Sequence, residues 1–385
     1  MDLYNRIAKL RYIPALIVGF VAAIPGNLLS KVLHSSSKVF LVGENGGHGF
    51  QDNGKYVFEE LIKEKAGQTY WMTSEMHDYI VLNRQCRIGS VRGYYYYFRS
   101  VAVFYTHSLS TDIAPLANRV TLFSPLHVEI SHGVEGFKRK IKTTQVTNFP
   151  ADLYTCSNSF EKSIKHHEWN ISNSKLLLTG VARYDGLVAS PKQKKSSLQI
   201  LYMPTWREWD YEDDYEQFKN SKTFQAIRQV CTSSDLEAVL VKTHSNLVVR
   251  LHPFFQKYFS QFDLAEFQPH VSLSDADVSQ LIHQSDMLVT DYSSVAWDFL
   301  YSLKPVAFYQ FDRIRYLQER GSYLSMPDDL FGPSTTDFNQ FSGIVDEMIS
   351  TPNMEILKAE RKKHFDFVDT NNSSRIVSMT LSRLR

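Results

Sequence analysis

One stretch of the chain, residues 281–312 (LIHQSDMLVTDYSSVAWDFLYSLKPVAFYQFD), constrains the fold more than any other. Two short apolar runs, at 287–289 and 306–309, flank a segment at 295–303 whose large apolar residues recur three and four positions apart. This pattern predicts a strand, a tight polar loop, a helix and a second strand. Strands joined through a helix lie parallel in one sheet, so the sequence predicts an α/β protein.

The loop between the first strand and the helix reads TDYSS, at residues 290–294. A helix that begins after Ser293 and Ser294 leaves its first backbone N–H groups without helical partners, and the helix dipole adds partial positive charge there. Such an end favours phosphate. The alternative is that one serine only caps an ordinary helix. From the loop residues alone, both interpretations stay open.

The same alternation of apolar runs and polar loops continues along the chain. Further strands are predicted at 39–43, 69–73, 101–106, 128–131, 176–181, 199–203 and 247–251. Helices are predicted at 56–65, 354–368 and 374–384. This spacing indicates parallel sheets covered on both faces, with ligands at the carboxyl ends of the strands. The stretch SPKQKKSS at 190–197 resembles a surface linker and places a domain boundary just before or within it.

Composition agrees with a two-domain globular protein. The 385 residues are 43% apolar and 22% charged, and the formal net charge of +1 argues against a polyanion-binding surface over the whole molecule. Cys86, Cys156 and Cys231 lie far apart and form no CxxC pair. An odd number of isolated cysteines indicates a reducing compartment and predicts neither a disulfide framework nor a zinc site.

The N-terminal part contains a largely apolar segment at 12–29, flanked by basic residues. Eighteen helical residues extend about 27 Å, slightly less than the roughly 30 Å bilayer core. We expect its prolines and glycines to interrupt the helix: Pro14, Gly19, Pro25 and Gly26. We interpret the segment as an interfacial or re-entrant anchor on the cytoplasmic face, with Arg and Lys near anionic headgroups. The alternative is a buried first helix that docks on the first domain.

Two further segments invite a ligand-binding interpretation. The glycine-rich loop GENGGHG at 43–49 follows a strand, but it matches neither GxGxxG nor GxxxxGK[ST], so it predicts only a bend where backbone approaches a ligand. Five aromatic residues at 94–98 lack alternating basic residues. They therefore indicate a packed or membrane-facing patch rather than a base-stacking platform.

Two histidines and one arginine lie where predicted strands end. His132 follows the run at 128–131, and His252 follows the run at 247–251. An imidazole with a pKa near 6.5 can accept a proton from a hydroxyl at neutral pH. Arg207 ends the run PTWR at 204–207, and its guanidinium suits bidentate phosphate contact. The alternative for Arg207 is a salt bridge at the rim with Glu208 or Asp210.

The TDYSS segment, with the helix and strand after it, resembles the C-terminal signature of the CDP-glycerol glycerophosphotransferases. This is the teichoic-acid primase and polymerase family, also found in capsule polymer synthesis. Four more matches follow the family's order along the chain: DNGK at 52–55, HG at 132–133, PTWR at 204–207 and RLHP at 250–253. Together the matches cover roughly residues 38 to 375.

The resemblance implies a GT-B-like fold with two Rossmann-like parallel-sheet domains that face each other across a cleft. We expect a membrane-associated segment at 1–33, an acceptor domain at 34–190 and a nucleotide-donor domain at 191–385. In this architecture the C-terminal helix crosses back to brace the first domain.

The resemblance also implies site residues. His132 would activate the acceptor hydroxyl and His252 would contact the donor phosphates. The donor-binding residues would be Thr205, Arg207, Arg250, Thr290, Asp291, Ser293 and Ser294, and the acceptor-binding residues Gly47, Asn53, Gly133 and Lys138. Asp291 and Asp298 are candidates to hold ribose or an acceptor hydroxyl, with Asp298 facing solvent as the alternative. This chain departs from the family's HGTPLK pattern, since Lys138 comes one place later, which bears on the acceptor more than on the donor.

The expected reaction is an in-line displacement. An acceptor hydroxyl, deprotonated by His132, attacks the β-phosphorus of a CDP-alditol, with CDP-glycerol the first candidate and CDP-ribitol the second. CMP leaves, stabilised by His252, Arg207 and the helix start at Ser293 and Ser294. Positioning and fixed charge dominate phosphoryl transfer, and no DxD motif or carboxylate pair calls for a metal, so we expect no metal and no cofactor.

The expected partners are a lipid-linked or polymeric acceptor and the cytoplasmic face of the cell membrane, with no nucleic acid. The protein would be peripheral or monotopic there. Two alternatives stay open: a GT-B nucleotide-sugar glycosyltransferase of surface polysaccharide synthesis, and a non-catalytic membrane-peripheral scaffold that binds a nucleotide. The transferase and glycosyltransferase interpretations both depend on His132 and His252 converging on one diphosphate.

Overall fold

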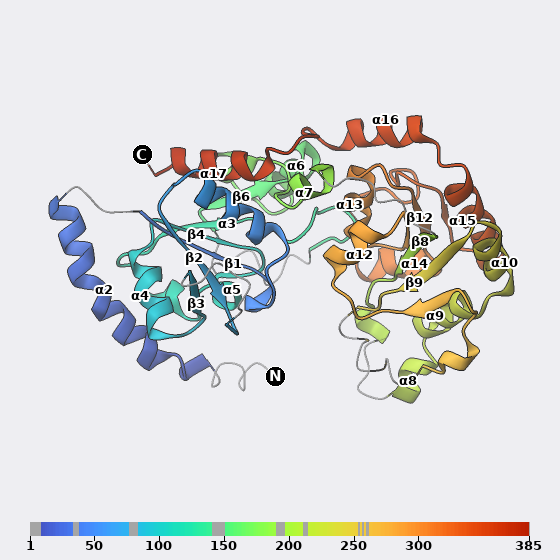
Figure 1. The fold of residues 1–385 in the computed structure, drawn as a ribbon, viewed down its shortest axis with the longest axis horizontal. Helices are drawn as coiled ribbons and strands as arrows, with labels where there is room; N and C mark the ends of the chain where they lie inside the picture. Colours follow the sequence, from blue (N-terminus) through green and yellow to red (C-terminus); the bar gives the residue numbers. More distant parts are fainter. Residues whose placement is uncertain are drawn as a thin grey trace. The chain divides into compact units, whose positions relative to one another are not determined.

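The computed structural model describes residues 9–33, 38–76, 84–140, 151–189, 197–210, 215–252, 255, 258 and 262–384. The chain divides into two compact units (Figure 1). Unit 1 contains Met1–Val134, Lys142–Ala189 and Asp366–Arg385, and unit 2 contains Glu135–Ile141 and Ser190–Phe365. Most of the expected linker, at 190–196, lies outside the described residues, as do Arg6 and Pro253. The chain changes unit at Ser190, but the segment Glu135–Ile141, expected in the first domain, belongs to unit 2.

Unit 1 is built on a seven-stranded parallel sheet in the order β3-β2-β1-β4-β5-β6-β7. The strands are β1 (Val39–Gly43), β2 (Gln68–Thr73), β3 (Gln85–Arg87), β4 (Ala102–Tyr105), β5 (Leu126–Glu129), β6 (Leu153–Cys156) and β7 (Leu176–Leu178). The central strand β1 is buried along its whole length, as a parallel strand covered on both faces should be.

Helices cover both faces of the unit 1 sheet. They are α2 (Ile13–Leu33), α3 (Asn53–Lys63), α4 (Val91–Arg99), α5 (Leu109–Asp112), α6 (Ser159–His167), α7 (Tyr184–Ala189) and α17 (Asn372–Ser382). Apolar residues of α3 and α17 share one core with β1 and β4. Two N–H groups at the start of α17, those of Asn372 and Ser373, donate to the buried carboxylate of Asp185, which fixes this C-terminal helix to unit 1.

Helix α2 is continuous, so the predicted interruption at its prolines and glycines is wrong. Its glycines permit close packing: a Cβ added at Gly19 would lie 2.5 Å from the Cβ of Tyr94 on α4. Phe20 packs edge-on against Phe98 of the same helix at 4.9 Å between ring centroids. Of the aromatic run at 94–98, Tyr94, Tyr97 and Phe98 are buried, so it is largely a packed surface. Within the described ranges, no helix combines the length and apolar character needed to cross a bilayer.

Unit 2 is built on a six-stranded parallel sheet in the order β10-β9-β8-β11-β12-β13. The strands are β8 (Leu198–Met203), β9 (Ser245–Val249), β10 (Val271–Leu273), β11 (Met287–Thr290), β12 (Val306–Tyr309) and β13 (Ser334–Thr335). The helices are α8 (Tyr215–Lys219), α9 (Lys222–Thr232), α10 (Ser234–Lys242), α12 (Val278–Gln284), α13 (Val295–Tyr301), α14 (Arg313–Glu319), α15 (Phe341–Ser350) and α16 (Met354–His364).

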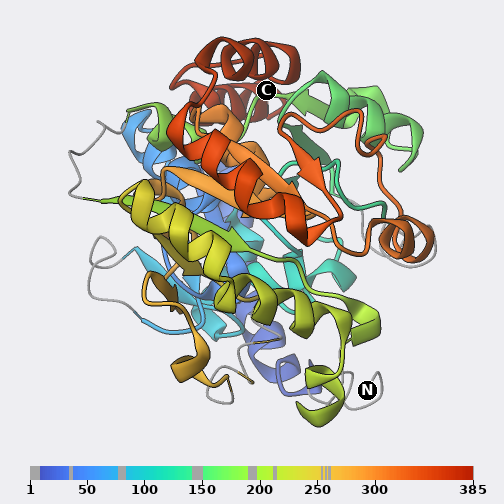
Figure 2. The same cartoon turned by 90° about the vertical axis from the view of Figure 1, so that its right-hand side faces the viewer.

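Alternate residues of the unit 2 strands point to opposite faces of the sheet. Ile200 of β8, Val289 of β11 and Tyr309 of β12 share a core with apolar residues of α9, α10 and α15, which lie over one face of the sheet (Figure 2). From the other face, Phe308 of β12 contacts the ring of Phe137. The predicted strand, loop, helix and strand at 281–312 are confirmed as β11, the TDYSS loop, α13 and β12.

Candidate active-site residues

In unit 1, His132 lies on the loop that follows β5, and its side chain is exposed. The backbone on both sides of it is held by side chains. Asn53 Nδ2 donates to the carbonyl of Ser131 at 3.0 Å, and Arg183 Nη1 donates to the carbonyl of His132 at 2.8 Å. Ser131 itself has a φ of 53° and donates through Oγ to the buried Gly133 at 2.8 Å. The loop therefore presents an exposed imidazole on a backbone fixed at several points.

Asn53 is fully buried at the start of α3 and serves as a link between loops. Its Oδ1 accepts from the backbone N–H of Arg183 at 2.9 Å, while its Nδ2 is bonded to Ser131. Arg183 in turn pairs with Asp52 at 3.2 Å. The structure does not offer the Asn53 amide to an acceptor as the sequence analysis expected, because both polar atoms are already used to position the His132 loop.

The glycine-rich loop after β1 packs against its own domain. Gly47 has a φ of 82°, and a Cβ there would overlap the amide nitrogen of Ser74 at the end of β2. Its carbonyl accepts from that amide at 3.0 Å. The close approach that requires glycine is thus to β2, whereas the sequence predicted an approach to a ligand.

The first residue after β1, Glu44, organises the start of α3. Its buried carboxylate accepts from the N–H groups of Gln51, Asp52 and Gly54 at 3.0, 3.1 and 2.8 Å. Burial, followed by the charge of Asp52, raises the pKa of Glu44 to about 7. The sequence analysis assigned no role to Glu44, although it shares the strand-end position of the residues that were chosen.

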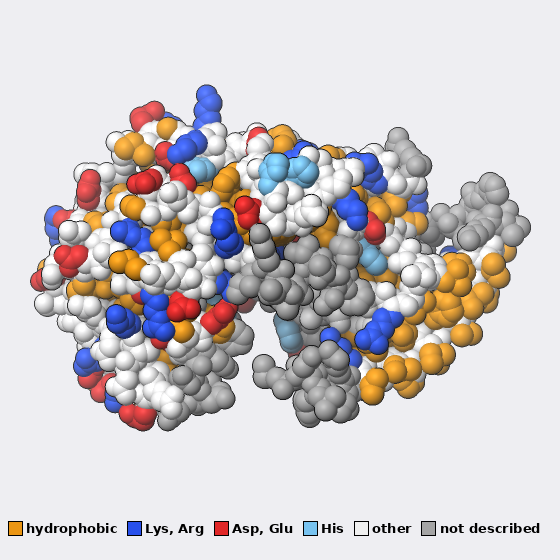
Figure 3. Space-filling model, turned by 180° about the vertical axis from the view of Figure 1, so that it is seen from behind, with side chains coloured by type: hydrophobic (Ala, Val, Ile, Leu, Met, Phe, Trp, Pro, Cys, Tyr) orange, Lys and Arg blue, Asp and Glu red, His pale blue; other side chains and the backbone are white. Residues whose placement is uncertain are grey.

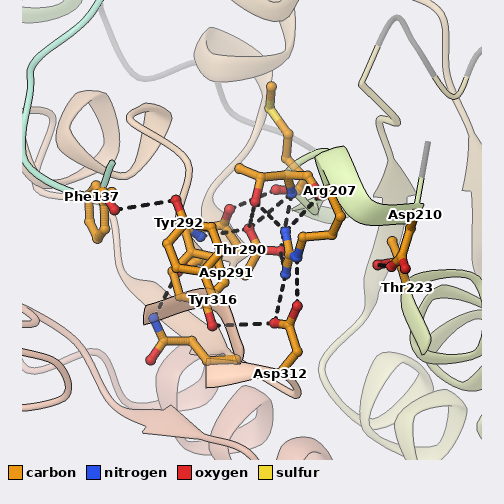
Figure 4. Close-up of polar contacts among 12 residues, drawn as sticks. Phe137, Arg207, Asp210, Thr223, Thr290, Asp291, Tyr292, Asp312 and Tyr316 are labelled. Carbon is orange, nitrogen blue, oxygen red and sulfur yellow. Dashed lines mark hydrogen bonds and ion pairs between the residues drawn. The ribbon is translucent and has the colours of Figure 1, made fainter. Parts of the chain in front are cut away.

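In unit 2, Arg207 lies at the centre of a buried ion-pair network (Figure 4). Its Nε and Nη2 donate to Asp312 at 2.7 and 3.0 Å, and Nη2 also donates to Asp291 at 2.8 Å. Its Nη1 donates to the carbonyl and the hydroxyl of Thr205 at 2.8 and 2.6 Å. Burial alone lowers the pKa of Arg207, but Asp291 and Asp312 raise it above its ordinary value, so the side chain stays charged.

This network corrects both interpretations of Arg207. Only 1% of the residue is exposed, and each guanidinium nitrogen donates within unit 2, so the side chain is placed to hold carboxylates rather than a donor phosphate. The alternative of a rim salt bridge is also wrong. Glu208 pairs with Arg320 at 2.6 Å, and Asp210 accepts from the hydroxyl of Thr223 at 2.5 Å.

Several other residues predicted to bind the donor hold the strand-end loops together. Asp291 accepts from the N–H groups of Thr205 and Tyr292 at 2.9 and 2.6 Å. The Thr290 hydroxyl donates to the carbonyl of Met203 at 2.6 Å, which links β11 to β8. Because the Asp291 carboxylate is buried in this network, it is not placed to hold ribose. Asp298 is fully buried, so the alternative in which it faces solvent is wrong.

The TDYSS loop leads directly into α13. Ser294 occupies the N-cap position, and its side chain makes no cap hydrogen bond. Ser293 Oγ accepts from the N–H of Val295, the first helical residue, at 3.3 Å. A phosphate at this loop stays a prediction.

His252 lies three residues beyond β9, half-buried and beside two cations. Burial, followed by the charges of Lys138 and Arg250, lowers its pKa to about 4. At neutral pH the imidazole is therefore uncharged. Burial also lowers the pKa of Lys138, and the nearby charge of Asp291 opposes that shift.

Lys138 is held in unit 2 by its neighbours in sequence. The Phe137 ring packs against Trp297 and Phe308, and the carbonyl of Gly136 accepts from the N–H of Tyr323 at 2.9 Å. Lys138 was predicted to bind the acceptor together with residues of the first domain. The structure instead places it among the residues predicted to bind the donor.

The sequence analysis also missed His107, which lies on the loop after β4 and stacks on His132. The same strand-end criterion that selected His132 would have found it. Across the ranges that the structure describes, no three His, Cys, Asp or Glu side chains are grouped to hold a metal ion.

The chain matches a known protein family over most of its length. A model of the CDP-glycerol:poly(glycerophosphate) glycerophosphotransferase family matches residues 29–382, which is most of the chain. The chain belongs to this family. All five motifs of the sequence analysis fall within the region that matches the family.

The sequence identity between this chain and individual members of the glycerophosphotransferase family is low. The chain is 24% identical to the minor teichoic acid biosynthesis protein GgaB of Bacillus subtilis, over 86% of this chain and 38% of that protein. It is 32% identical to a teichoic acid glycerol-phosphate transferase of Staphylococcus aureus, over 47% of each chain. It therefore spans less than half the length of these two relatives.

The fold is shared with a solved structure. The wall teichoic acid polymerase TagF matches with a TM-score of 0.68 and 18% identity, over 99% of this chain and 98% of that one. A TagF variant soaked with CDPG matches with a TM-score of 0.67. At this identity the likeness concerns the fold alone, two parallel-sheet α/β domains.

Proposed function

We propose that the protein transfers an alditol phosphate, with glycerol phosphate the first candidate, from a CDP-alditol to an acceptor hydroxyl and releases CMP. Its product would be a teichoic-acid-like or capsule polymer. The observation that carries the proposal is the family match over residues 29–382, which includes the two motif histidines on loops that follow parallel strands. Ligands of parallel α/β sheets bind at those strand ends.

In the proposed reaction, His132 acts as the base. Its exposed imidazole takes the proton of an acceptor hydroxyl, and that oxygen forms a bond to the β-phosphorus of the donor. The bond between the β-phosphorus and the bridging oxygen breaks, CMP leaves with the electron pair, and a phosphodiester remains. The fixed backbone around His132 supports this role, because a base must be held in one place for in-line attack.

Unit 2 would neutralise the leaving CMP. His252 is neutral at neutral pH and would donate a hydrogen bond to a phosphate oxygen, while Lys138 and Arg250 beside it supply positive charge. Ser293, Ser294 and the N–H groups at the start of α13 would complete the phosphate site. Arg207 would act indirectly by holding Asp291, Asp312 and Thr205 in place.

We further propose that the acceptor residues belong mainly to unit 1 and the donor residues to unit 2. The chain passes from unit 1 to unit 2 between Val134 and Glu135, two residues after His132, so the proposed base and Lys138 lie on one short segment. This continuity supports a reaction in which both units take part.

Product analysis tests the reaction. Purified protein is incubated with an acceptor and, in turn, CDP-glycerol, CDP-ribitol and UDP- or CMP-sugars, and released nucleotide and product mass are measured. We expect CMP release with a CDP-alditol and a product heavier by one alditol phosphate. Turnover with a nucleotide sugar and none with either CDP-alditol would instead support the glycosyltransferase.

A substitution tests the base. We expect His132→Ala to lower kcat by about 10²- to 10⁴-fold while donor binding is largely retained. His167→Ala, at an exposed histidine on α6, is the matched control and should leave kcat unchanged. A His132→Ala variant that turns over like the wild type would favour the non-catalytic scaffold.

We also propose that the protein lies on the cytoplasmic face of the membrane through the outer face of α2. One side of this helix packs on α4, while apolar side chains on another side are exposed: Ile17, Val18, Val21, Leu28 and Leu29 are 53–58% exposed. Figure 3 shows hydrophobic side chains gathered along this region. A helix with one apolar face outward is suited to lie in the headgroup region.

The membrane proposal is tested with Ile17→Gln/Val21→Gln/Leu28→Gln, which leaves the face toward α4 intact. We expect the variant to lose sedimentation with vesicles that contain anionic lipid, while turnover of a short soluble acceptor is kept. The control is Ile314→Gln on α14, where the side chain is 76% exposed. If the triple variant sediments like the wild type, another surface binds the membrane.

A further inference from the structure

Two imidazole rings lie face to face in unit 1. The ring centroids of His107 and His132 are 4.5 Å apart, and the ring planes differ by 11°. The two residues follow neighbouring strands, β4 and β5, which pair in parallel from Ala102 with Leu126 to Tyr105 with Glu129. The stack therefore lies where the carboxyl ends of these strands bring two loops together.

His107 is held on a buried anchor. Its backbone N–H donates to Asp112 Oδ2 at 2.8 Å, and its Nδ1 lies 2.9 Å from the hydroxyl of Thr106. Asp112 is fully buried and also accepts from the N–H groups of Thr106 and Gly46 at 3.0 and 2.9 Å. The loop that carries His107 is thus tied both to α5 and to the glycine-rich loop after β1.

His132 is fixed differently, because side-chain hydrogen bonds from Asn53 and Arg183 hold its backbone. Asn53 and Arg183 bind the carbonyls of Ser131 and His132, which sets where the side chain begins. The plane of an exposed ring depends on its own two torsions, and a neighbouring ring that packs flat against it restricts both. His107 provides such a surface for His132.

We propose that His107 is a positioning residue for His132: its ring, anchored through Thr106 and Asp112, holds the His132 imidazole in the plane required for proton abstraction. The inference rests on the proposed function, in which His132 is the base. A misplaced base lowers the rate of the chemical step, since small displacements cost up to about 10²-fold. Donor binding, assigned to unit 2, should be unaffected.

The test compares two substitutions with CDP-glycerol as donor. His107→Ala removes the stacked surface and should lower kcat by about 10- to 100-fold, with the donor KM changed less than about twofold. His107→Phe keeps a flat ring and should recover kcat to within about threefold of the wild type. His48→Ala is the matched control, an exposed histidine on the glycine-rich loop that is bonded to Ser74, and it should behave like the wild type.

The outcomes separate this inference from the proposed function. No turnover by the wild type with any CDP-alditol would reject the proposed function itself. If the wild type is active and His132→Ala is not, then full activity in His107→Ala overturns the positioning role. A His107→Phe variant as slow as His107→Ala would also overturn it, because the ring surface would then not be what His107 contributes.

Discussion

The two motif histidines lie in contrasting surroundings. His132 of unit 1 is exposed, and hydrogen bonds hold its backbone and a second imidazole covers its ring. His252 of unit 2 is half-buried beside Lys138 and Arg250, and its pKa is lowered to about 4. A group that exchanges protons with a substrate needs access to it, whereas a group that binds phosphate gains from a shielded, positively charged site.

The buried carboxylates of the two units also have different hydrogen-bond partners. In unit 1, Glu44 and Asp112 are buried carboxylates that accept mainly from backbone N–H groups. In unit 2, Asp291 and Asp312 share the buried guanidinium of Arg207. In unit 1 the carboxylates hold loops through hydrogen bonds to the backbone. In unit 2 the ion-pair network also fixes the charged guanidinium of Arg207 in position. Unit 1 is therefore expected to be sensitive to pH through Glu44, and unit 2 to the loss of a charged partner.

The largest expected effect on stability comes from breaking the ion-pair network of unit 2. Arg207→Met should lower the free energy of unfolding by about 3–5 kcal/mol, because it leaves two carboxylates buried without their cation. Chemical denaturation measures this loss. The control, Arg320→Met, removes an exposed pair with Glu208 and should cost less than about 1 kcal/mol. Equal losses in the two variants would contradict the structural role assigned to the buried network of unit 2.

The second prediction concerns the pH dependence of unit 1. The pKa of Glu44 is about 7 in the fold, against 4.5 as its ordinary value, so the folded state binds more protons between these pH values. Stability contributed by protonated Glu44 is fully present below about pH 4.5 and is lost as pH rises through 7, a loss of about 3 kcal/mol. In Glu44→Gln this loss should disappear, whereas it should remain in Glu59→Gln on the exposed side of α3.

The same measurement distinguishes the two units, because the pH dependence of stability that His252 contributes in unit 2 has the opposite sign to that of Glu44. His252 is protonated less readily in the fold than in the unfolded chain, so its contribution is present above about pH 6.5 and is lost as pH falls toward 4. Unfolding curves recorded from pH 4 to 7.5 should therefore show an acid-sensitive component in the wild type that is absent in His252→Gln. A Glu44→Gln profile with the same pH dependence as the wild type would rule out the Glu44 contribution.

The smallest expected effect on stability comes from Asn53→Ala, which removes the link between the Ser131 carbonyl and the Arg183 amide. The loss should be about 1–3 kcal/mol, since two buried polar groups are left without partners. The value of kcat should also fall, because the backbone of the His132 loop is no longer held. Asn220→Ala, at an exposed asparagine bonded to the Glu216 carbonyl, is the control for both measurements.

Much of the fold could be predicted from local pattern. All nine predicted strands are present, because short apolar runs of three to six residues bounded by polar loops are typical of parallel strands. The missed strands β3, β6, β10 and β13 have two to four residues, too few to show a period. In α2, Pro14 lies in the first turn, where proline is tolerated, and the glycines fit against α4, while the helix also continues through Pro25 in its interior.

The sequence by itself determined the parallel α/β units, the strand-end position of His132 and His252, and the family motifs, since each depends on residues close together in the chain. Only the tertiary structure decided what the polar side chains do. Arg207 finds its partners 84 and 105 positions away, Asn53 reaches a carbonyl 78 positions away, and Lys138 lies in the other unit from His132. A charged or polar group takes whichever partner folding brings within hydrogen-bond distance, and that choice is not written in its sequence neighbours.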